Sequence, residues 1–450
     1  MNPKDALARN ALAVPEILLP EAAHDLSRWA VIACDQYTQD RDYWERVSAR
    51  VADAPSTLRL VLPEVYLEDA DRKARLAAIR EAMTRYLDAD SGVFAEPVTG
   101  LVYIERLTAY GRKRAGLVAA VDLDAYDWKP GSAAPVRATE ATIVDRIPPR
   151  MEIRRGAPLE TPHIMLLVND PDHLLVRATG ERARARQALY STALEPDSGS
   201  ITGWAVSSDE DLELVAKALS RLASDNADPD GKPFLFAVGD GNHSLATAKA
   251  VWDEYRDSVR TAAKGDPSKA EGAEAALARH PARYALVEIV NLYDEGLTFE
   301  PIHRVLFGTT AEELSAYLQR RLGGTIRTVP DAAAIETAVS EPGTTRFGFV
   351  SATGLSLLDS PDPALAVARL QPVLDDFLGE HAGTSIDYIH GSEEVFRLGS
   401  RADAVALLLP PVEKDSFFAT IGSGGPLPRK SFSMGEASEK RYYLECRRLF

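Results

Sequence analysis

One stretch of the chain decides the fold: residues 234–248 read FLFAVGDGNHSLATA. The five apolar residues at its start predict a buried strand, and the spacing of Leu245 and Trp252 predicts a helix after it. Gly239 and Gly241 permit a tight turn between the two. We therefore expect a strand–turn–helix unit. It is not a Walker A loop, because no Gly-Lys-Ser/Thr follows, and it is not a dinucleotide fingerprint.

The turn is a candidate anion site. The first N–H groups of a helix have no intrahelical partner and lie at the positive end of its dipole, so phosphate binding is physically available there. Asp240 can hold a metal or act as a base, and His243 can hold or pass a proton. A structural interpretation stays open, in which Asp240, Asn242 or Ser244 only caps the helix.

Outward from this stretch, short apolar runs alternate with segments of helical spacing. Residues 101–153 look like successive strands and turns, so we expect an α+β fold of mixed sheets with flanking helices rather than one parallel sheet. The expected domains are an N-terminal α+β domain over 1–160, a central domain with the GDGNHS turn over 161–310, and a C-terminal α+β domain over 311–450. The expected strands are 30–33, 101–104, 164–168, 234–238, 285–290, 347–350 and 404–409, and the expected helices include 72–87, 211–223, 245–255 and 311–322.

Composition narrows the classes of function. The 450 residues carry 51 Lys+Arg and 67 Asp+Glu, a net charge of 51 − 67 = −16, which disfavours nucleic acid as the main partner. No run approaches the ~18 apolar residues that a membrane span needs, so we expect no membrane partner. The two cysteines, Cys34 and Cys446, fit a reducing compartment. We therefore expect a cytoplasmic enzyme or ligand-binding protein.

Residues 137–155 reverse the local charge, with five arginines in an acidic chain. The forked donors of arginine suit phosphate and carboxylate, so Arg137, Arg146 and Arg150 could form an anion-binding wall. In the alternative, the arginines pair with Glu140 and neighbouring acids on a strand surface, where an exposed pair contributes ~0–1 kcal/mol.

Two acidic positions are further candidates. Glu288 lies inside an apolar run, where a carboxylate is costly unless it is paired or faces a cavity. An edge strand that turns Glu288 to solvent is the alternative. Glu300 and His303 lie three residues apart beside a proline, and could form an acid–base pair or cap a helix.

Polar residues also follow an apolar run near the N-terminus, where Asp35, Gln36 and Tyr37 are plausible site residues. Cys34 is expected to be a buried small hydrophobe, because no local histidine is visible to activate it.

Two other segments have competing interpretations. His163 precedes the run 164–168 and an Asn-Asp pair follows it, but the Asn-Asp-Pro-Asp order favours a turn there. Lys430 lies in the Gly/Ser-rich segment 422–435, which could fold over a phosphate or form a plain surface loop.

Together these motifs resemble a bacterial and archaeal family called domain of unknown function 1015. The central motif of that family, usually Asp-Gly-His-His-Arg, is similar to the phosphate-binding turn of the ParB, sulfiredoxin and free serine kinase superfamily. In that superfamily a Gly-x-x-Arg turn binds nucleotide phosphates. The resemblance therefore implies a ParB/sulfiredoxin-like central unit, ATP or ADP binding, and serine or phosphoserine chemistry. It rests on residues 34–38, 137–140, 146–150, 239–248, 299–304 and 429–433.

The chain departs from this motif at two positions. Asn242 stands where the first histidine is common, and Ser244 stands where the arginine would be. The backbone N–H groups of the turn remain, but the positive charge has to come from elsewhere. The available residues are Arg137, Arg150, Arg304 and Lys430.

The leading hypothesis is an enzyme, a phosphotransferase or phosphatase, that transfers or hydrolyses a phosphoryl group on a small phosphorylated metabolite or nucleotide. It would use Mg²⁺ or another divalent metal held by Asp240. The alternative is a non-catalytic nucleotide-binding regulator. The predicted catalytic residues are Asp240, His243, Glu288 and His303, and the predicted phosphate- and substrate-binding residues are Gly239, Gly241, Asn242, Ser244, Arg137, Glu140, Arg146, Arg150, Asp35, Gln36, Tyr37, Arg304 and Lys430.

Overall fold

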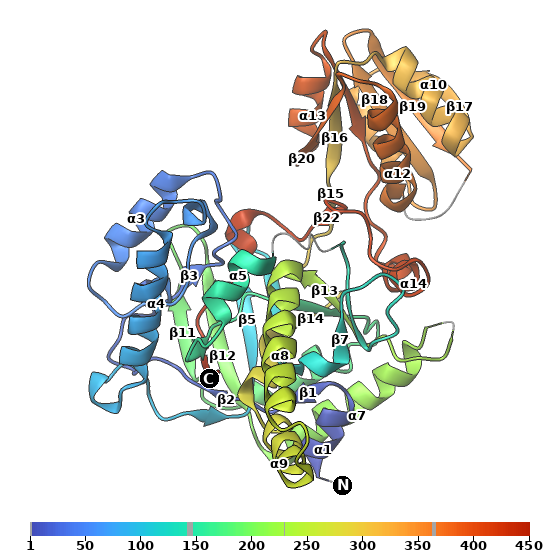
Figure 1. The fold of residues 1–450 in the computed structure, drawn as a ribbon. Helices are drawn as coiled ribbons and strands as arrows, with labels where there is room; N and C mark the ends of the chain where they lie inside the picture. The colour runs from blue at the N-terminus through green and yellow to red at the C-terminus, as the bar shows by residue number, and fades with distance from the viewer. Residues whose placement is uncertain (1, 142–146, 229, 362–365) are drawn as a thin grey trace. The chain divides into compact units, whose positions relative to one another are not determined.

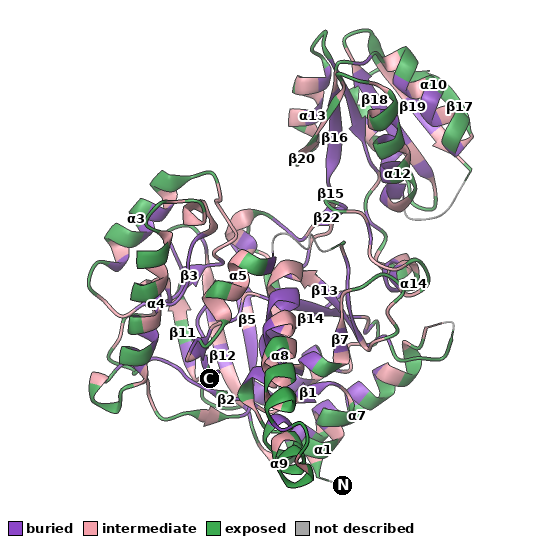
Figure 2. Cartoon of the chain, viewed as in Figure 1, coloured by how far each residue is buried: buried purple, intermediate pink, exposed green. Residues whose placement is uncertain are grey.

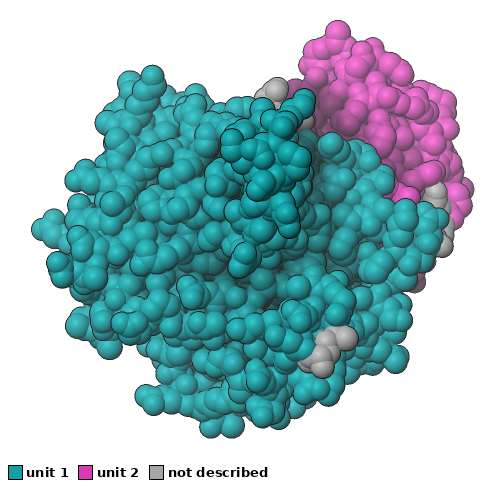
Figure 3. Space-filling model, turned by 60° about the horizontal axis from the view of Figure 1, so that its bottom comes forward, with its two compact units in different colours: residues 1–297, 436–450 teal, residues 298–435 magenta. Residues whose placement is uncertain are grey.

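The computed structural model describes residues 2–141, 147–228, 230–361 and 366–450 (Figure 1). The fold is mixed, with 40% helix and 25% strand, which confirms the predicted class of mixed sheets with flanking helices. The chain forms two compact units: unit 1 is residues 1–297 with 436–450, and unit 2 is residues 298–435 (Figure 3). Of the boundaries expected from the sequence, the one near residue 160 falls inside unit 1 and the one near 310 inside unit 2.

Unit 1 contains a large mixed sheet, ordered β11-β12-β5-β6-β14-β10-β13-β8-β7, with β1 also paired to β6. The central strand β10 runs parallel to β14 and antiparallel to β13, so the carboxyl end of β13 lies beside the start of β10. The strands are β1 (Leu12–Ala13), β5 (Leu101–Leu107), β6 (Lys113–Asp122), β7 (Tyr126–Asp127), β8 (Val136–Ala138), β10 (Met165–Val168), β11 (Tyr190–Ala193), β12 (Ser200–Val206), β13 (Phe236–Asp240) and β14 (Tyr284–Asn291).

Three short strand pairs complete unit 1, and two of them are made by the C-terminal residues of the chain. β23 (Tyr442–Tyr443) pairs with β3 (Val31–Ile32), and β24 (Arg447–Arg448) pairs with β9 (Leu159–Glu160). The third pair is β2 (Glu16–Ile17) with β4 (Val98–Thr99).

Two helices of unit 1 begin at residues of the expected type, because Ser208 caps α7 and Asp266 caps α9 through their side-chain oxygens. The helices are α1 (Pro3–Arg9), α2 (Leu26–Trp29), α3 (Arg41–Val51), α4 (Arg72–Leu87), α5 (Ile147–Arg154), α6 (Val176–Ala183), α7 (Asp209–Asp225), α8 (Asn242–Ala262) and α9 (Pro267–Leu277).

Helix α5 differs from the strand surface considered for this arginine-rich segment. Pro148 and Pro149 lie in its first turn, where a proline costs little because the N–H groups there have no intrahelical acceptor. Arg146 lies outside the described residues.

Unit 2 has its own antiparallel sheet, ordered β17-β19-β18-β21-β16-β20, and a strand pair β15-β22. Its strands are β15 (Glu300–Pro301), β16 (His303–Phe307), β17 (Thr325–Val329), β18 (Thr345–Ser351), β19 (Gly354–Ser360), β20 (Ser385–Ile389), β21 (Ala404–Leu408) and β22 (Phe432–Ser433). Its helices are α10 (Ala311–Leu322), α11 (Ala332–Val339), α12 (Ala366–Glu380), α13 (Ser392–Gly399) and α14 (Lys414–Gly424).

Each unit is organised around its own sheet, and the central strands of both sheets are buried (Figure 2). In unit 1 the buried strand residues join one apolar core with Leu245 and Trp252 of α8. The expected strands and helices are therefore observed, and the strand–turn–helix unit predicted at residues 234–248 is confirmed as β13, the turn and α8. Among the helices that the structure describes, none is long and apolar enough to cross a membrane.

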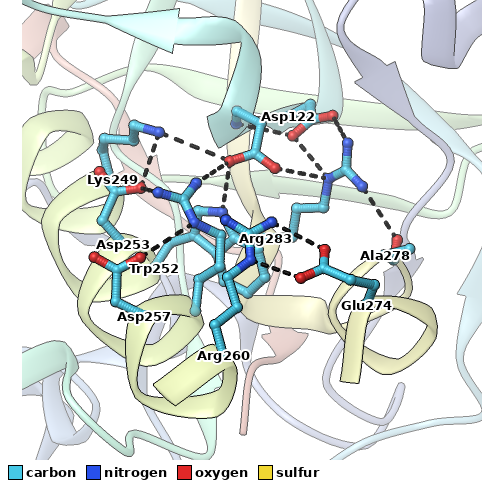
Figure 4. Close-up of polar contacts among 11 residues, drawn as sticks. Asp122, Lys249, Trp252, Asp253, Asp257, Arg260, Glu274, Ala278 and Arg283 are labelled. Carbon is cyan, nitrogen blue, oxygen red and sulfur yellow. Dashed lines mark hydrogen bonds and ion pairs between the residues drawn. The ribbon is translucent and has the colours of Figure 1, made fainter. Parts of the chain in front are cut away.

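Beyond its buried first turns, α8 is held by a network of opposite charges (Figure 4). Asp124, which follows β6, accepts hydrogen bonds from Trp252 Nε1 at 2.8 Å and Arg256 Nη1 at 2.7 Å. Arg260 makes two hydrogen bonds to Glu274 of α9, at 2.7 and 2.9 Å. These contacts join the second half of α8 to the segment that follows β6 and to α9.

Candidate functional site

The site is built on the turn between β13 and α8. Gly241 is the residue before the helix and has φ of 79°, which favours glycine. A side chain there would also bring its Cβ to 3.1 Å from Ile164 Cα. The first intrahelical bond joins Leu245 N–H to the Gly241 carbonyl. The N–H groups of residues 242–244 therefore precede the helical ladder, as the anion-site prediction requires.

Asn242 fastens this turn to the end of β8. Its Oδ1 accepts the Thr139 N–H and its Nδ2 donates to Thr139 Oγ1, both at 3.2 Å. The structure gives α8 no side-chain capping bond at Gly241, and Asp240 Oδ1 accepts the N–H of Gly241 instead. The polar residues of the motif are thus not explained by capping of α8 alone.

A histidine from another segment meets the first turn of α8. His163 Nε2 lies 2.7 Å from Ser244 Oγ, and His163 Nδ1 lies 2.9 Å from the Tyr443 hydroxyl. The Tyr443 oxygen also accepts the Cys34 N–H at 3.1 Å. We call Cys34, Asp35, His163, Ser244 and Tyr443 the His163 cluster.

Asp35 supplies the negative charge of this cluster, because one of its carboxylate oxygens lies 3.8 Å from His163 Nε2. Burial disfavours the charged carboxylate, but His163, a hydrogen bond from Gln36 and the ammonium of Lys440 keep the pKa of Asp35 below its ordinary value. The same Lys440 lies 3.3 Å from Asp240 Oδ2. Two predicted carboxylates thus share one lysine beside the glycine turn.

Three other predicted residues are near these groups in the chain. Gln36 Nε2 donates to Asp35 Oδ1 at 3.0 Å, which helps to hold that carboxylate. Tyr37 has φ of 51°, and its ring stacks on Tyr43 with 3.9 Å between the centroids. His243 is half-buried, and its carbonyl accepts the Thr247 hydroxyl.

Glu288 is buried in ion pairs. Its two carboxylate oxygens lie 2.5 Å from Arg441 Nη1 and 3.5 Å from Arg114 Nε. Burial raises the pKa of Glu288, but these arginines more than offset it and hold the pKa below its ordinary value. The alternative in which Glu288 faces solvent is wrong, since the side chain is 1% exposed.

The arginines and Glu140 proposed for the anion wall differ in their surroundings. Arg137 is buried and donates to Asp228 and to the Ala134 carbonyl, so its guanidinium holds the loop before β13. Arg150 pairs with Glu64. Glu140 is half-buried.

Three predicted residues belong to unit 2. His303 is buried and accepts the Leu409 N–H at 3.1 Å; burial, Arg304 and His390 lower its pKa to about 4. Arg304 is buried too and donates to Gln371 at 3.1 Å. Lys430 has φ of 58°.

Sequence reasoning missed three members of the site, namely His163, Lys440 and Tyr443. The sequence favours a plain turn after the run 164–168, so it gives His163, which precedes that run, no role in a site. Lys440 and Tyr443 belong to the last residues of the chain, where Arg441, Tyr443 and Glu445 are buried. The alternation of Arg441, Tyr443 and Glu445 along the chain is typical of a strand, and this signal could have pointed to Tyr443.

No curated protein sequence matches this chain. A free serine kinase mutant solved in complex with ADP has 10% identity and a TM-score of 0.35, over 73% of this chain and 87% of that one. SbnI with a C-terminal truncation, from Staphylococcus aureus, has 10% identity and a TM-score of 0.36, over 71% and 82%. A conserved hypothetical protein from Pyrococcus furiosus has 12% identity and a TM-score of 0.31, over 73% and 90%.

These structural likenesses are too low to define an activity. The sequence match is broader, because residues 17–377 fit the family described as "Protein of unknown function (DUF1015)". The chain therefore belongs to the DUF1015 family.

Proposed function

We propose that unit 1 is a phosphate-binding enzyme that transfers or hydrolyses a phosphoryl group on a small metabolite or nucleotide. The observation that carries the proposal is the convergence of Asp35, His163 and Lys440 on the glycine turn before α8. A lysine and the first N–H groups of a helix suit phosphate oxygens, and a histidine beside a carboxylate suits proton transfer.

Each group has a role in this proposal. Lys440 and the N–H groups of residues 242–244 bind the phosphate. Lys440 thereby takes the role of the arginine that the family motif usually carries. His163 delivers or removes the proton of the reacting oxygen, and Asp35 stabilises the imidazolium that forms. The proposal includes ATP or ADP bound in a ParB/sulfiredoxin-like mode. It also includes serine or phosphoserine as the substrate. Both parts come from the family resemblance.

A divalent metal at Asp240 fits these residues poorly. Both oxygens of Asp240 already meet donors, Lys440 and the Gly241 N–H. Within the described parts of the chain, no group of three or more His, Cys, Asp or Glu side chains is arranged to hold a metal. We therefore derive no step through a metal, and Asp240 as a ligand stays a prediction that an assay with and without Mg²⁺ tests.

The test is phosphorus NMR of the full chain incubated with ATP or ADP plus serine, and with phosphoserine alone. We expect consumption of one of these phosphates, and Lys440→Ala should weaken it about 100-fold, because the phosphate then loses the ammonium that lies beside Asp240 at the turn. Lys217→Ala is the matched control, since Lys217 is exposed and pairs with Glu213 of the same helix.

The outcomes separate the candidate functions. Turnover lost in Lys440→Ala and kept in Lys217→Ala supports the enzyme. Nucleotide binding by equilibrium dialysis without consumption would favour the regulator instead. The proposal is overturned if the chain neither binds nor consumes any of these phosphate compounds.

A further inference from the structure

A cavity of about 150 Å³ opens beside the His163 cluster. His163, Ser244 and Tyr443 line it at one side, and most of the remaining wall is apolar. The apolar lining includes Leu62, Leu67, Met83, Ile153, Ala157 and Leu159. The charged lining residues pair with one another, Arg150 with Glu64 and Arg154 with Glu160. The apolar part of the wall therefore suits a ligand that has an apolar group to bury there.

Tyr443 contacts the second ring nitrogen of His163. The Tyr443 oxygen accepts the Cys34 N–H at 3.1 Å and lies 2.9 Å from His163 Nδ1. In the tautomer with its proton on Nδ1, His163 donates to this oxygen. The lone pair of His163 Nε2 then faces Ser244 Oγ at 2.7 Å.

We propose that Ser244 is the nucleophile of a carboxylic-ester hydrolase, with His163 as its base and the apolar cavity as its acyl-binding pocket. The nucleophile and base are within hydrogen-bond reach, and a third group orients the base. The proposal goes beyond the phosphate chemistry above and does not rest on it.

The reaction needs only the ester and water. His163 Nε2 takes the hydroxyl proton of Ser244 as Oγ attacks the ester carbonyl carbon, and the C=O electron pair moves to the oxygen. The tetrahedral adduct collapses, the bond to the alcohol oxygen breaks, and the alcohol leaves with the proton from His163. Water then attacks the acyl-Ser244 carbonyl, giving its proton to His163. Collapse releases the carboxylic acid and returns that proton to Ser244.

Two features of the site assist this reaction. Asp35 lies 3.8 Å from His163 Nε2, so the imidazolium forms beside a carboxylate. The N–H groups of the first turn of α8 adjoin Ser244 in the chain and favour the developing oxyanion. Cys34 is not a competing nucleophile, because burial raises the pKa of its thiol far above neutrality.

The size of the cavity sets the substrate class. A cavity of about 150 Å³ has room for roughly ten atoms, since one water molecule needs ~15 Å³ of such space. We therefore expect short acyl chains, with hydrolysis of p-nitrophenyl butyrate and hexanoate faster than that of acetate or dodecanoate.

The experiment uses the full chain, this ester series and a fluorophosphonate that modifies activated serines. Mass spectrometry should find the label on Ser244. Ser244→Ala should abolish labelling and lower hydrolysis by about 10³-fold, whereas Ser258→Ala should change neither, because Ser258 is exposed on the same helix. Ala157→Leu narrows the cavity, and should lower the rate with hexanoate about tenfold relative to acetate.

The proposal is overturned if Ser244→Ala hydrolyses the esters at the rate of the unmodified chain, or if the label is found on another residue. It is also overturned if the chain is folded, as shown by cooperative melting, and yet hydrolyses none of the esters. The esters contain no phosphoryl group, so these failures are distinct from a failure of the phosphate assays.

Discussion

The two ends of α8 are both polar, but they are built from different chemistry. In its second half, Arg256 and Arg260 meet carboxylates of opposite charge on neighbouring elements (Figure 4). At its first turn, Ser244 meets an imidazole, and both line a cavity. One end pairs full charges with one another, and the other brings together groups that exchange protons.

This difference separates stability from chemistry on one helix. Pairs of opposite charge with several hydrogen bonds fix the helix to η4 (Leu123–Ala125) and α9, and such groups gain little from a ligand. A serine and a histidine beside an unfilled space gain from a ligand that brings a reactive carbon or phosphorus atom. Changes at the two ends should therefore affect different measurements.

The largest effect on stability is expected for Asp124→Ala. Its carboxylate accepts from the Trp252 indole and from Arg256, and the variant leaves both donors without it. We expect the free energy of unfolding to fall by about 2 kcal/mol, with unchanged fluorophosphonate labelling of Ser244. Urea unfolding measures the first and mass spectrometry the second.

Asp257→Ala is the control for this variant. Asp257 lies 3.7 Å from Arg256 in the same network, but its side chain is 70% exposed, so we expect a change below about 0.5 kcal/mol. Equal losses in both variants would mean that the network is no stronger than ordinary surface pairs.

Tyr443→Phe should have the opposite profile. The variant removes the acceptor of His163 Nδ1–H, so both tautomers of the ring become available and the bare nitrogen no longer faces Ser244 all the time. We expect kcat for ester hydrolysis to fall about tenfold, equivalent to ~1.4 kcal/mol, with KM unchanged because the apolar cavity is kept.

Tyr442→Phe is the matched control, because the neighbouring ring packs against Arg106 and not against His163. A rise in KM without a fall in kcat for Tyr443→Phe would show that Tyr443 shapes the cavity rather than orienting the histidine.

Much of the fold could be predicted from the sequence, because its signals are local. The apolar run and the two glycines at residues 234–241 are enough to define β13 and the turn. Helices α4 and α10 begin and end at the residues expected from their spacing. The division of the chain was harder, because residues 436–450 return to unit 1 after the whole of unit 2. A local sequence pattern does not predict such a return of the chain to its first unit.

The site could be predicted only in part, for the same reason. Asp35, Asp240 and Ser244 stand beside recognisable strands or turns. His163 and Tyr443 are 280 residues apart, and the pairing of β23 with β3 and of β24 with β9 brings their segments together. Arg137 and Glu288 were reasonable candidates by residue type, but buried partners of opposite charge occupy them, and sequence alone does not reveal such partners.

The smallest effect is expected in the acid dependence of stability. Burial raises the pKa of Asp124, but the Trp252 hydrogen bond and the cations Lys249, Arg256 and Arg283 bring it below its ordinary value. A carboxylate whose pKa is lowered on folding stabilises the folded state above its unfolded pKa, near 4, and loses this contribution as pH falls through the lower folded value.

Asp124→Asn keeps the shape of the side chain but cannot titrate. Between about pH 5 and about pH 3, the unmodified chain should therefore lose roughly 0.5–1 kcal/mol more stability than the variant, discounted because Asp124 is 34% exposed. Urea unfolding at several pH values measures the two slopes. Parallel slopes would mean that the charges around Asp124 leave its proton affinity unchanged on folding, and the contrast between the two ends of α8 would then rest on geometry alone.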